Sequence, residues 1–415
     1  MSGGTALVNR PVITAWSAVS PFGIGRAAFT EGIRERRPAA AGLDDERWQA
    51  AGDRACLVPD FDLRTVLGKK GVRSMDRVTG LAVTTVARLL DDAPRNRWVA
   101  TGEDAALVLG TTTGSVQSQM DFTRDSFTGE KPYLVDPARF PNAVMNCAAG
   151  QSAIWHQLKG PNTTIAGGHA AGLYALNYAR RLLTFGRART VLCGAVEEFS
   201  HARSWLERHA HRPGTEGPAQ LPGEGCGLLL VEQRGSGVRD DTACTVGASP
   251  AVQRGSGARD DTACTVGASS AVQRGSGARD DAEQPVLAEI LAVEMGIALD
   301  GGVRPALAAC LRRALDRAGV RPEEIWAVST SEAPGPSGEQ ERAAVAEAAK
   351  GADPVHLTQA ALIGDTGAAA AAFQIAGVLV HAETTPEAAD RVALVTSVDR
   401  DGAVGCALLR LAGPR

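Results

Sequence analysis

The sequence predicts a layered α/β fold made of two halves in which helices cover β-sheets. Short apolar runs, which suit buried strands, alternate along the chain with longer amphipathic segments, which suit helices. This alternation occurs twice, on either side of a polar tandem repeat. The 415 residues, 44% of them hydrophobic, are enough for a large buried core and roughly two to three domain-sized units.

The first half is predicted from the segments that precede the repeat. Helices are expected over Met75–Leu90 and over Ala170–Leu183. The second of these places its leucines on one side and is followed by Gly186, a typical helix-ending residue. Four short apolar runs are expected to form buried strands: Val12–Trp16, Ala105–Gly110, Thr190–Val196 and Gly227–Glu232.

The second half shows the same alternation after the repeat. Its most apolar stretch, Gly367–Val380, is too short and too rich in small side chains to span a bilayer, so we expect a buried helix there. The other elements expected in this half are the strands Pro285–Val293, Ile325–Ser329, Val392–Thr396 and Gly405–Leu411 and the helices Pro305–Ala318 and Glu339–Ala349.

A tandem repeat separates the two halves. Gln233–Val252 and Gln253–Val272 are near copies, and a third copy begins directly after them. Such a period can indicate a solenoid, but two copies with few large apolar residues cannot bury a core of their own. We therefore expect a duplicated surface loop, with a small added hairpin as the alternative. The chain is divided accordingly into an N-terminal half (1–232), an insertion (233–282) and a C-terminal half (283–415).

Composition and charge exclude several classes of function. Lysine and arginine (43) and aspartate and glutamate (47) nearly cancel to a net charge of −4, whereas a nucleic-acid or anionic-membrane surface needs a basic excess. Aromatic residues make up only 4%, too few for base-stacking platforms. The N-terminus lacks a signal-peptide pattern, and the eight cysteines are scattered without ligand spacing. We therefore expect a cytoplasmic protein that binds neither nucleic acid, membrane nor metal.

Three motifs follow one another in the first half. They are Asn146–Gln151 with Leu158–Pro161, then Thr164–Leu173, then Val191–Glu198. Together they resemble the β-ketoacyl synthases of fatty-acid and polyketide synthesis. The resemblance runs from Pro11 to the final strand and is interrupted only by the repeats. It implies the thiolase fold, in which two similar α/β halves stack as α-β-α-β-α layers.

The resemblance places His169 where the family has its nucleophilic cysteine. That cysteine lies at a strand-to-helix turn, where the helix N-terminus lowers the thiol pKa and backbone N–H groups hold the thioester oxyanion. A nucleophilic His169 stays an alternative, but an acyl-imidazole hydrolyses readily and a helix N-terminus disfavours a protonated histidine. We therefore expect a structural or gating role for His169.

The remaining catalytic positions implied by the resemblance are also replaced. Ser331 and Asp365 stand where the family has two histidines that polarise the malonyl thioester. Asp365 should repel a malonyl carboxylate by about 4 kcal/mol at ~4 Å and an effective dielectric constant of about 20. The catalytic lysine is missing near Gln359, and the phenylalanine-gated turn reads Asp399–Gly402, with Arg400 at the gate. Condensation by this chain alone is therefore not expected, and no cofactor is implied.

Loss of the nucleophile within a recognisable synthase resembles the chain-length factor, the β subunit of type II polyketide synthases, in which glutamine usually replaces the cysteine. The resemblance implies a non-catalytic subunit that pairs with a cysteine-containing ketosynthase through Asn162–Ala166 and Phe140–Gly150. Such a subunit shapes the acyl tunnel, limits chain length and meets the acyl carrier protein. One alternative is a decarboxylase that primes the pathway by converting malonyl to acetyl on its carrier protein, although such decarboxylases usually keep their histidines. Another is a stand-alone scaffold for carrier protein.

The segment from Met120 to Phe127 resembles the chain-length factor helix whose bulky residues close the far end of the polyketide cavity. Met120, Thr123 and Phe127 are spaced i, i+3 and i+7, so on a helix they share one face. Together with Arg400 they are the predicted tunnel residues. An ordinary core stripe is the alternative for the three helical positions.

Two other patterns are less informative. Cys244 and Cys264 stand in peptides that look like the family's active site, but they lie in the polar repeats without an apolar strand before them. His209 and His211 could ligate a metal, but a lone His-x-His beside arginines is expected in a solvated segment. His156 is expected to make a structural hydrogen bond.

Overall fold

The computed structural model describes residues 10–44, 46–211, 219–234, 286–299 and 302–414. The chain divides into two compact units: Met1–Arg234 with Pro285–Arg415, and Gly235–Gln284. The second unit, which holds most of the tandem repeat together with Cys244 and Cys264, lies outside the described residues. The surface-loop interpretation of the repeat therefore stays a prediction.

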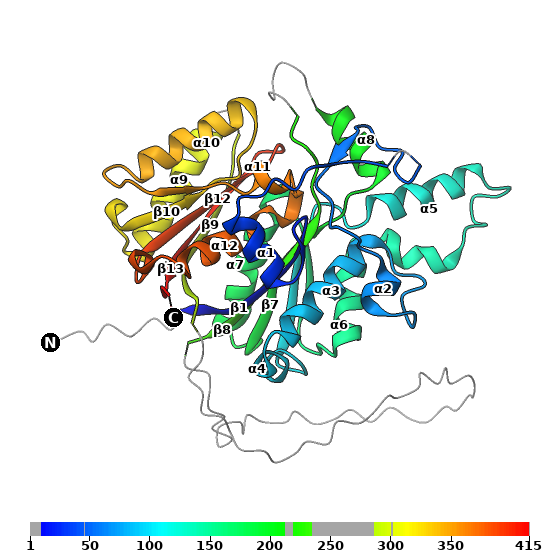
Figure 1. Cartoon of the computed structure of the whole chain (residues 1–415), viewed down its shortest axis with the longest axis horizontal. Helices are drawn as coiled ribbons and strands as arrows, with labels where there is room; N and C mark the ends of the chain where they lie inside the picture. Colours follow the sequence, from blue (N-terminus) through cyan, green and yellow to red (C-terminus); the bar gives the residue numbers. More distant parts are fainter. Residues whose placement is uncertain (1–9, 45, 212–218, 235–285, 300–301, 415) are drawn as a thin grey trace, which may run out of the picture. The chain divides into compact units, whose positions relative to one another are not determined.

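Both halves of the first unit use the same strand order. In the N-terminal half the long strands lie in the order β6-β5-β7-β8-β1, and in the C-terminal half the order is β11-β10-β12-β13-β9. Each half therefore places its third, second, fourth, fifth and first strands side by side. The two halves join where Val12 and Ile13 of β1 pair with Glu289 and Ala288 of β9. This repetition confirms the prediction of two similar α/β halves (Figure 1).

Helices cover the sheet of each half on both faces. Figure 1 shows α7 and α12 between the strands of the two halves, and their apolar side chains form a shared core with residues such as Val108 and Leu409. On the outer face of the N-terminal half, α3 buries Leu81 against the strands. On the outer face of the C-terminal half, α9 buries Leu307 in a separate core. The layers are thus α-β-α-β-α, as the thiolase fold requires.

The strands and helices of these layers are close to the predicted ones. Ile325–Ser329 and Asn162–Ala166 have the predicted bounds, and the other expected elements begin or end within a few residues of them. The strands of the two halves are β1 (Pro11–Ser20), β5 (Ala105–Thr111), β6 (Asn162–Ala166), β7 (Thr190–Glu197), β8 (Gly225–Gln233), β9 (Ala288–Ile297), β10 (Ile325–Ser329), β11 (Val355–Leu357), β12 (Val392–Val398) and β13 (Ala403–Leu411). The helices are α1 (Arg26–Arg34), α2 (Leu63–Leu67), α3 (Arg77–Asp91), α4 (Pro94–Val99), α5 (Val116–Thr128), α6 (Cys147–His156), α7 (Ala171–Thr184), α8 (His201–Ala210), α9 (Val303–Ala318), α10 (Gly335–Ala348), α11 (Ala360–Ile363) and α12 (Ala370–Ala382).

Residue types at the helix ends explain several of these bounds. Asp76 caps α3 by accepting a hydrogen bond from the backbone N–H of Thr79 at 3.0 Å. Gly186, with φ of 62°, follows α7 as predicted, and Gly319, with φ of 65°, ends α9. Helices α6 and α8 were not predicted, because α6 is short and rich in small residues and α8 is largely polar.

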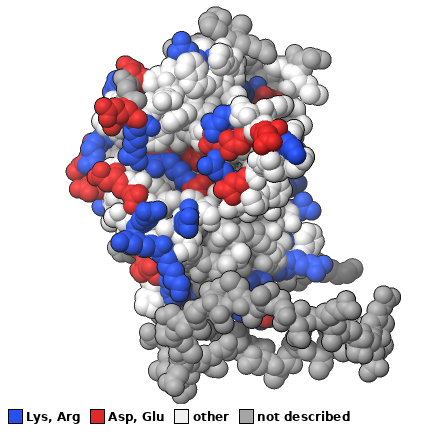
Figure 2. All heavy atoms as spheres, turned by 90° about the vertical axis from the view of Figure 1, so that its right-hand side faces the viewer, with Lys and Arg blue, Asp and Glu red and all other residues white. Residues whose placement is uncertain are grey.

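The surface agrees with the balanced composition. Figure 2 shows a face on which Lys and Arg atoms are interspersed with Asp and Glu atoms, separated by broad uncharged areas. Among the helices of the described residues, none is long and apolar enough to cross a membrane.

Candidate functional site

His169 lies at the turn that joins β6 to α7, in the short 3₁₀ turn Gly168–Ala170. Glycine is required beside it, because Gly168 has φ of 52° and a Cβ there would lie 2.2 Å from Oδ1 of Asp399. The turn therefore brings His169 into direct contact with the segment that follows β12. His169 is partly buried there, with 22% of its side chain exposed.

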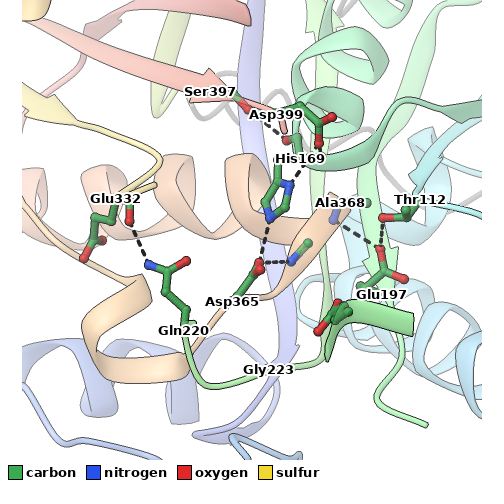
Figure 3. A network of polar contacts seen from close by, with 12 residues as sticks. Thr112, His169, Glu197, Gln220, Gly223, Glu332, Asp365, Ala368, Ser397 and Asp399 are labelled. Atoms are coloured by element: carbon green, nitrogen blue, oxygen red, sulfur yellow. Dashed lines mark hydrogen bonds and ion pairs between the residues drawn. The ribbon is translucent and has the colours of Figure 1, made fainter. Parts of the chain in front are cut away.

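Two carboxylates hold the His169 ring from opposite sides (Figure 3). Nε2 lies 2.8 Å from Oδ1 of Asp365, and Nδ1 lies 3.0 Å from Oδ1 of Asp399. The backbone N–H of His169 also donates to Oδ1 of Asp399, at 2.8 Å. Because each ring nitrogen faces an acceptor-only group, both nitrogens carry protons and the ring is an imidazolium.

These contacts shift the pKa of all three groups. The charge of Asp365 raises the pKa of His169 well above its usual value; burial opposes this shift, and hydrogen bonds to Asp365 and Asp399 support it. Burial would raise the pKa of Asp365 and of Asp399, but the charge and hydrogen bonds of His169 hold both below their usual range. The two carboxylates therefore outweigh the unfavourable effect expected from the helix N-terminus, and the pKa of His169 rises.

A protonated imidazole that donates a hydrogen bond from each ring nitrogen has no free lone pair with which to attack a thioester. The geometry therefore favours the structural interpretation of His169 over the nucleophilic one. The expected repulsion between Asp365 and a malonyl carboxylate also needs correction, since His169 already compensates the charge of Asp365.

Buried polar groups on neighbouring elements fix the Asp365 loop. Gly367 donates its backbone N–H to Oδ1 of Asp365 at 2.9 Å. Arg203 of α8 donates to the Asp365 carbonyl oxygen at 3.0 Å. Glu197, at the end of β7, accepts hydrogen bonds from Thr112 and from the Ala368 backbone, and burial raises its pKa. The loop is therefore held from both the N-terminal and the C-terminal half.

Ser331 belongs to a second, adjacent network. Its Oγ donates to Glu341 at 2.6 Å and its backbone N–H donates to the same carboxyl at 2.9 Å. Thr396 also donates to Glu341, at 2.6 Å, and burial raises the pKa of Glu341. The two networks meet on β12, because Ser397, next to Thr396, donates to the carbonyl oxygen of His169 at 2.9 Å.

Glu332 fills the position beside Ser331 in a conformation that side chains rarely adopt. Its φ is 55°, and its carboxylate accepts the backbone N–H groups of Gln359 (2.6 Å), Ala360 (2.8 Å) and Ala361 (3.2 Å). These are the N–H groups at the start of α11, where the resemblance implies a missing lysine. Figure 3 shows Gln220 donating to the Glu332 carbonyl oxygen at 2.7 Å.

The site therefore satisfies its own hydrogen-bond donors. His169, Ser331 and the start of α11 are each bonded to a carboxylate of this chain: Asp365 and Asp399, Glu341, and Glu332, respectively. A substrate carboxylate or a thioester oxyanion would have to displace one of these internal partners. Two surface hollows of about 610 and 280 Å³ contain none of His169, Ser331 or Asp365.

The predicted tunnel residues lie apart from this cluster, on the outer surface of the chain. Met120 is 50% and Phe127 is 84% exposed, and Thr123 is exposed beside them on α5. The alternative of a core stripe is wrong, because no residue of α5 is buried. Arg400 is exposed in the turn that follows β12. Their role as tunnel residues stays a prediction.

Several residues of the cluster were not singled out from the sequence. Asp399 was noted only as part of an altered turn, and Glu197, Arg203 and Glu332 were not proposed at all. The His169–Asp399 contact joins residues 230 positions apart, so no local spacing could have indicated it. One signal in the sequence could have indicated the cluster: two of the altered family positions, 365 and 399, are aspartates, and a third, 169, is a histidine that could pair with them.

The other candidates behave as structural groups. His156 is buried, with Nε2 2.9 Å from the carbonyl oxygen of Val83, which confirms the expected structural hydrogen bond. His209 is exposed and stacks on Trp205. Within the described ranges, no group of three or more His, Cys, Asp or Glu side chains is placed to hold a metal ion.

Comparisons with known proteins agree with this architecture. A profile of the β-ketoacyl synthase N-terminal domain matches residues 9–235. The chain belongs to the β-ketoacyl synthase family. The solved structure of the ishigamide ketosynthase/chain length factor is 43% identical, with a TM-score of 0.79, and the match covers 97% of this chain and 100% of that one.

More distant members of the family share part of the chain. The 3-oxoacyl-[acyl-carrier-protein] synthase 2 of Synechocystis is 28% identical over 244 residues, which cover 54% of this chain and 58% of the relative. The tetracenomycin polyketide synthase ketoacyl synthase alpha subunit of Streptomyces glaucescens is 27% identical over 46% of each chain. The chain thus spans about half the length of the curated relatives that it matches.

Proposed function

We propose that the chain is a non-catalytic chain-length factor that forms a heterodimer with a cysteine-containing ketosynthase and receives growing chains from an acyl carrier protein. The observation that carries this proposal is the contact of both His169 ring nitrogens with Asp365 and Asp399, at the position where the family has its nucleophile. The 43% identity to the ishigamide ketosynthase/chain length factor supports the same assignment. The proposed pathway is of the type II polyketide kind or a related polyene or fatty-acid-like kind.

The free edge of β6 supports pairing with a second subunit. β6 ends the order of the described strands, with β5 on its inner side. Leu107 donates its N–H to Pro161, so the alternating backbone groups of Asn162, Thr164 and Ala166 point away from β5. An unpaired edge of this kind is a template for another strand.

Exposed apolar side chains also occur on nearby parts of the sequence. They come from α5, from the segment that follows it and from α6, which contacts β6, and include Phe127, Tyr133, Leu134, Phe140, Met145 and Ile154. Large apolar surfaces of this kind mark protein–protein interfaces, and obligate interfaces bury upwards of about 2,000 Å². A partner that covers this surface would also close a cavity over the exposed face of α5.

The isolated chain is expected neither to condense nor to decarboxylate malonyl groups on carrier protein, because its acid–base and oxyanion-binding groups are occupied internally. Co-expression with a cysteine-containing ketosynthase, sought in the neighbouring reading frames, is expected to give a stable heterodimer with condensing activity. Product analysis by mass spectrometry, with the chain alone, the partner alone and the pair, measures both outcomes. Steady acetyl-carrier formation by the chain alone, abolished by His169→Ala, would instead support the priming decarboxylase.

Phe127→Ala is expected to lengthen the acyl product of the heterodimer. Shrinking a side chain that closes a cavity removes a steric stop, since each further methylene forced into a filled pocket costs roughly 1–3 kcal/mol. The measurement is the distribution of product lengths at equal heterodimer concentration. Phe185→Ala is a matched control, because Phe185 is also exposed, at 69%, but directly follows α7. An unchanged length at normal yield would remove Phe127 from the tunnel wall.

A further inference from the structure

Helix α5 is tied to the buried part of the chain at its N-terminal end. None of its thirteen residues is buried, so core packing does not fix its position. Its capping residue Ser115, in contrast, is only 2% exposed. Further along, the helix meets a surface segment through an ion pair between Asp125 and Arg139 and a ring contact between Phe122 and Phe140, in which the α5 partners are half-buried and the others exposed. Figure 1 shows α5 extending away from the strands.

One buried carboxyl connects this end of α5 to the core. Glu198 follows β7, is 2% exposed, and accepts a hydrogen bond from Oγ of Ser115 at 2.9 Å through Oε1. Its Oε2 accepts the backbone N–H of Val78, in the first turn of α3, at 3.1 Å. Glu198 therefore ties the starts of α5 and α3 to the end of a central strand.

A second carboxyl reinforces the same junction. Asp76, which caps α3, accepts a hydrogen bond from Oγ of Ser118 in α5 at 3.2 Å. Arg203 donates to the carbonyl oxygen of Glu198 and not to its carboxyl. Arg77, whose charge interacts with Glu198, forms its ion pair with Glu224. Burial first, and the charge of Asp76 second, raise the pKa of Glu198 to about 8. Glutamine keeps the size of this side chain and one of its two acceptor oxygens, whereas alanine removes both.

We propose that Glu198 is a positioning residue that sets the orientation of α5 through Ser115, and thereby the depth of the cavity that Phe127 closes. This inference rests on the proposed chain-length function. Phe127 lies twelve residues beyond Ser115, roughly 18 Å along the helix axis at 1.5 Å per residue. A tilt of about 5° at the capped end moves Phe127 by roughly 1.5 Å, close to the length of one carbon–carbon bond.

The test compares Glu198→Ala and Ser115→Ala with the conservative variants Glu198→Gln and Ser115→Thr, each in the heterodimer with the cysteine-containing ketosynthase. Both alanine variants are expected to broaden the product distribution, with at least a tenfold rise in chains that differ from the main product by one extension unit. The conservative variants are expected to keep the original main product. Condensation rate and heterodimer yield serve as readouts of folding. If Glu198→Ala gives no heterodimer, Ser115→Ala decides the question, because it removes one hydroxyl only.

The outcomes separate this inference from the proposed function. If Phe127→Ala shifts product length while both alanine variants keep the original distribution, Glu198 does not position α5 and the chain-length function stands. If Phe127→Ala and both alanine variants all leave the length unchanged, Phe127 is not part of the tunnel wall and the inference fails, whereas the chain-length function fails only if the heterodimer itself does not form or does not condense. A broadened distribution with Glu198→Gln equal to that with Glu198→Ala also overturns the inference.

Discussion

Replacing His169 by alanine is expected to lower the free energy of unfolding by about 3 kcal/mol, because it leaves two carboxylates buried without their common cation. Asp365 and Asp399 are 15% and 7% exposed, so water cannot replace the lost partner efficiently. The measurement is the denaturation midpoint and slope of the purified protein at neutral pH, compared with wild type. His209→Ala is the matched control, since His209 is an exposed histidine on a helix surface.

The same contact predicts how stability changes with pH. The folded-state pKa of His169 is raised, so its contribution is complete below the unfolded-state value near ~6.5 and is lost as pH rises through the folded-state value. The folded-state pKa values of Asp365 and Asp399 are lowered, so their contributions are present above about 4 and are lost as pH falls further. The stability difference between wild type and His169→Ala is therefore expected to be largest between about pH 4 and 6.5.

A charge-free version of the cluster provides the counter-test. Combining His169→Gln with Asp365→Asn and Asp399→Asn removes the cation and both anions together, so it is expected to cost less stability than His169→Ala alone. The charge interpretation is overturned if the triple variant is as unstable as His169→Ala. It is also overturned if the stability difference between wild type and His169→Ala does not change with pH.

Thr164→Pro is expected to abolish heterodimer formation while leaving the chain folded. Proline removes the N–H that Thr164 directs away from β5 and places its ring on the free edge. The hydrogen bonds between β6 and β5 are kept, because they use the neighbouring backbone groups. Co-purification with the ketosynthase measures pairing, and circular dichroism of the variant checks the fold.

Thr164→Val is the control for this edge. Its backbone N–H is retained, and the buried Oγ1 of Thr164 has no hydrogen-bond partner to lose. Normal pairing of the valine variant together with loss of pairing in the proline variant assigns the effect to the backbone. Normal pairing of the proline variant would place the interface elsewhere.

The sequence predicted the layers well because a buried element shows as a run of apolar residues in the sequence. Strands such as β7 and β12 are buried along their whole length and read as unbroken apolar runs, which is why their positions were predicted. The apolar helix α12 was recognised as a buried element for the same reason. Helix α6 shows no comparable pattern, since its small residues give no clear apolar face.

The sequence predicted the site only as a set of positions at which the family's catalytic groups are replaced. Motif order located His169, Ser331 and Asp365, but the protonation state of His169 depends on Asp399, which reaches it only through the packing of the two halves. Considering the helix N-terminus alone predicts a lowered pKa for His169, whereas the two carboxylates raise it. The α5 positions were correctly placed on one face, yet spacing alone could not tell an inward face from an outward one, and the structure places them outward.

The internally paired donors of the site also constrain how this lineage can change. A single substitution that placed cysteine at position 169 would leave Asp365 and Asp399 without their cationic partner. One that placed histidine at position 331 would remove the hydrogen bond from the Ser331 hydroxyl to Glu341. Intermediates on the path back to a working synthase therefore pass through less stable proteins before any catalysis is gained. Each additional internal pair adds to the stability that such a reversal would have to give up.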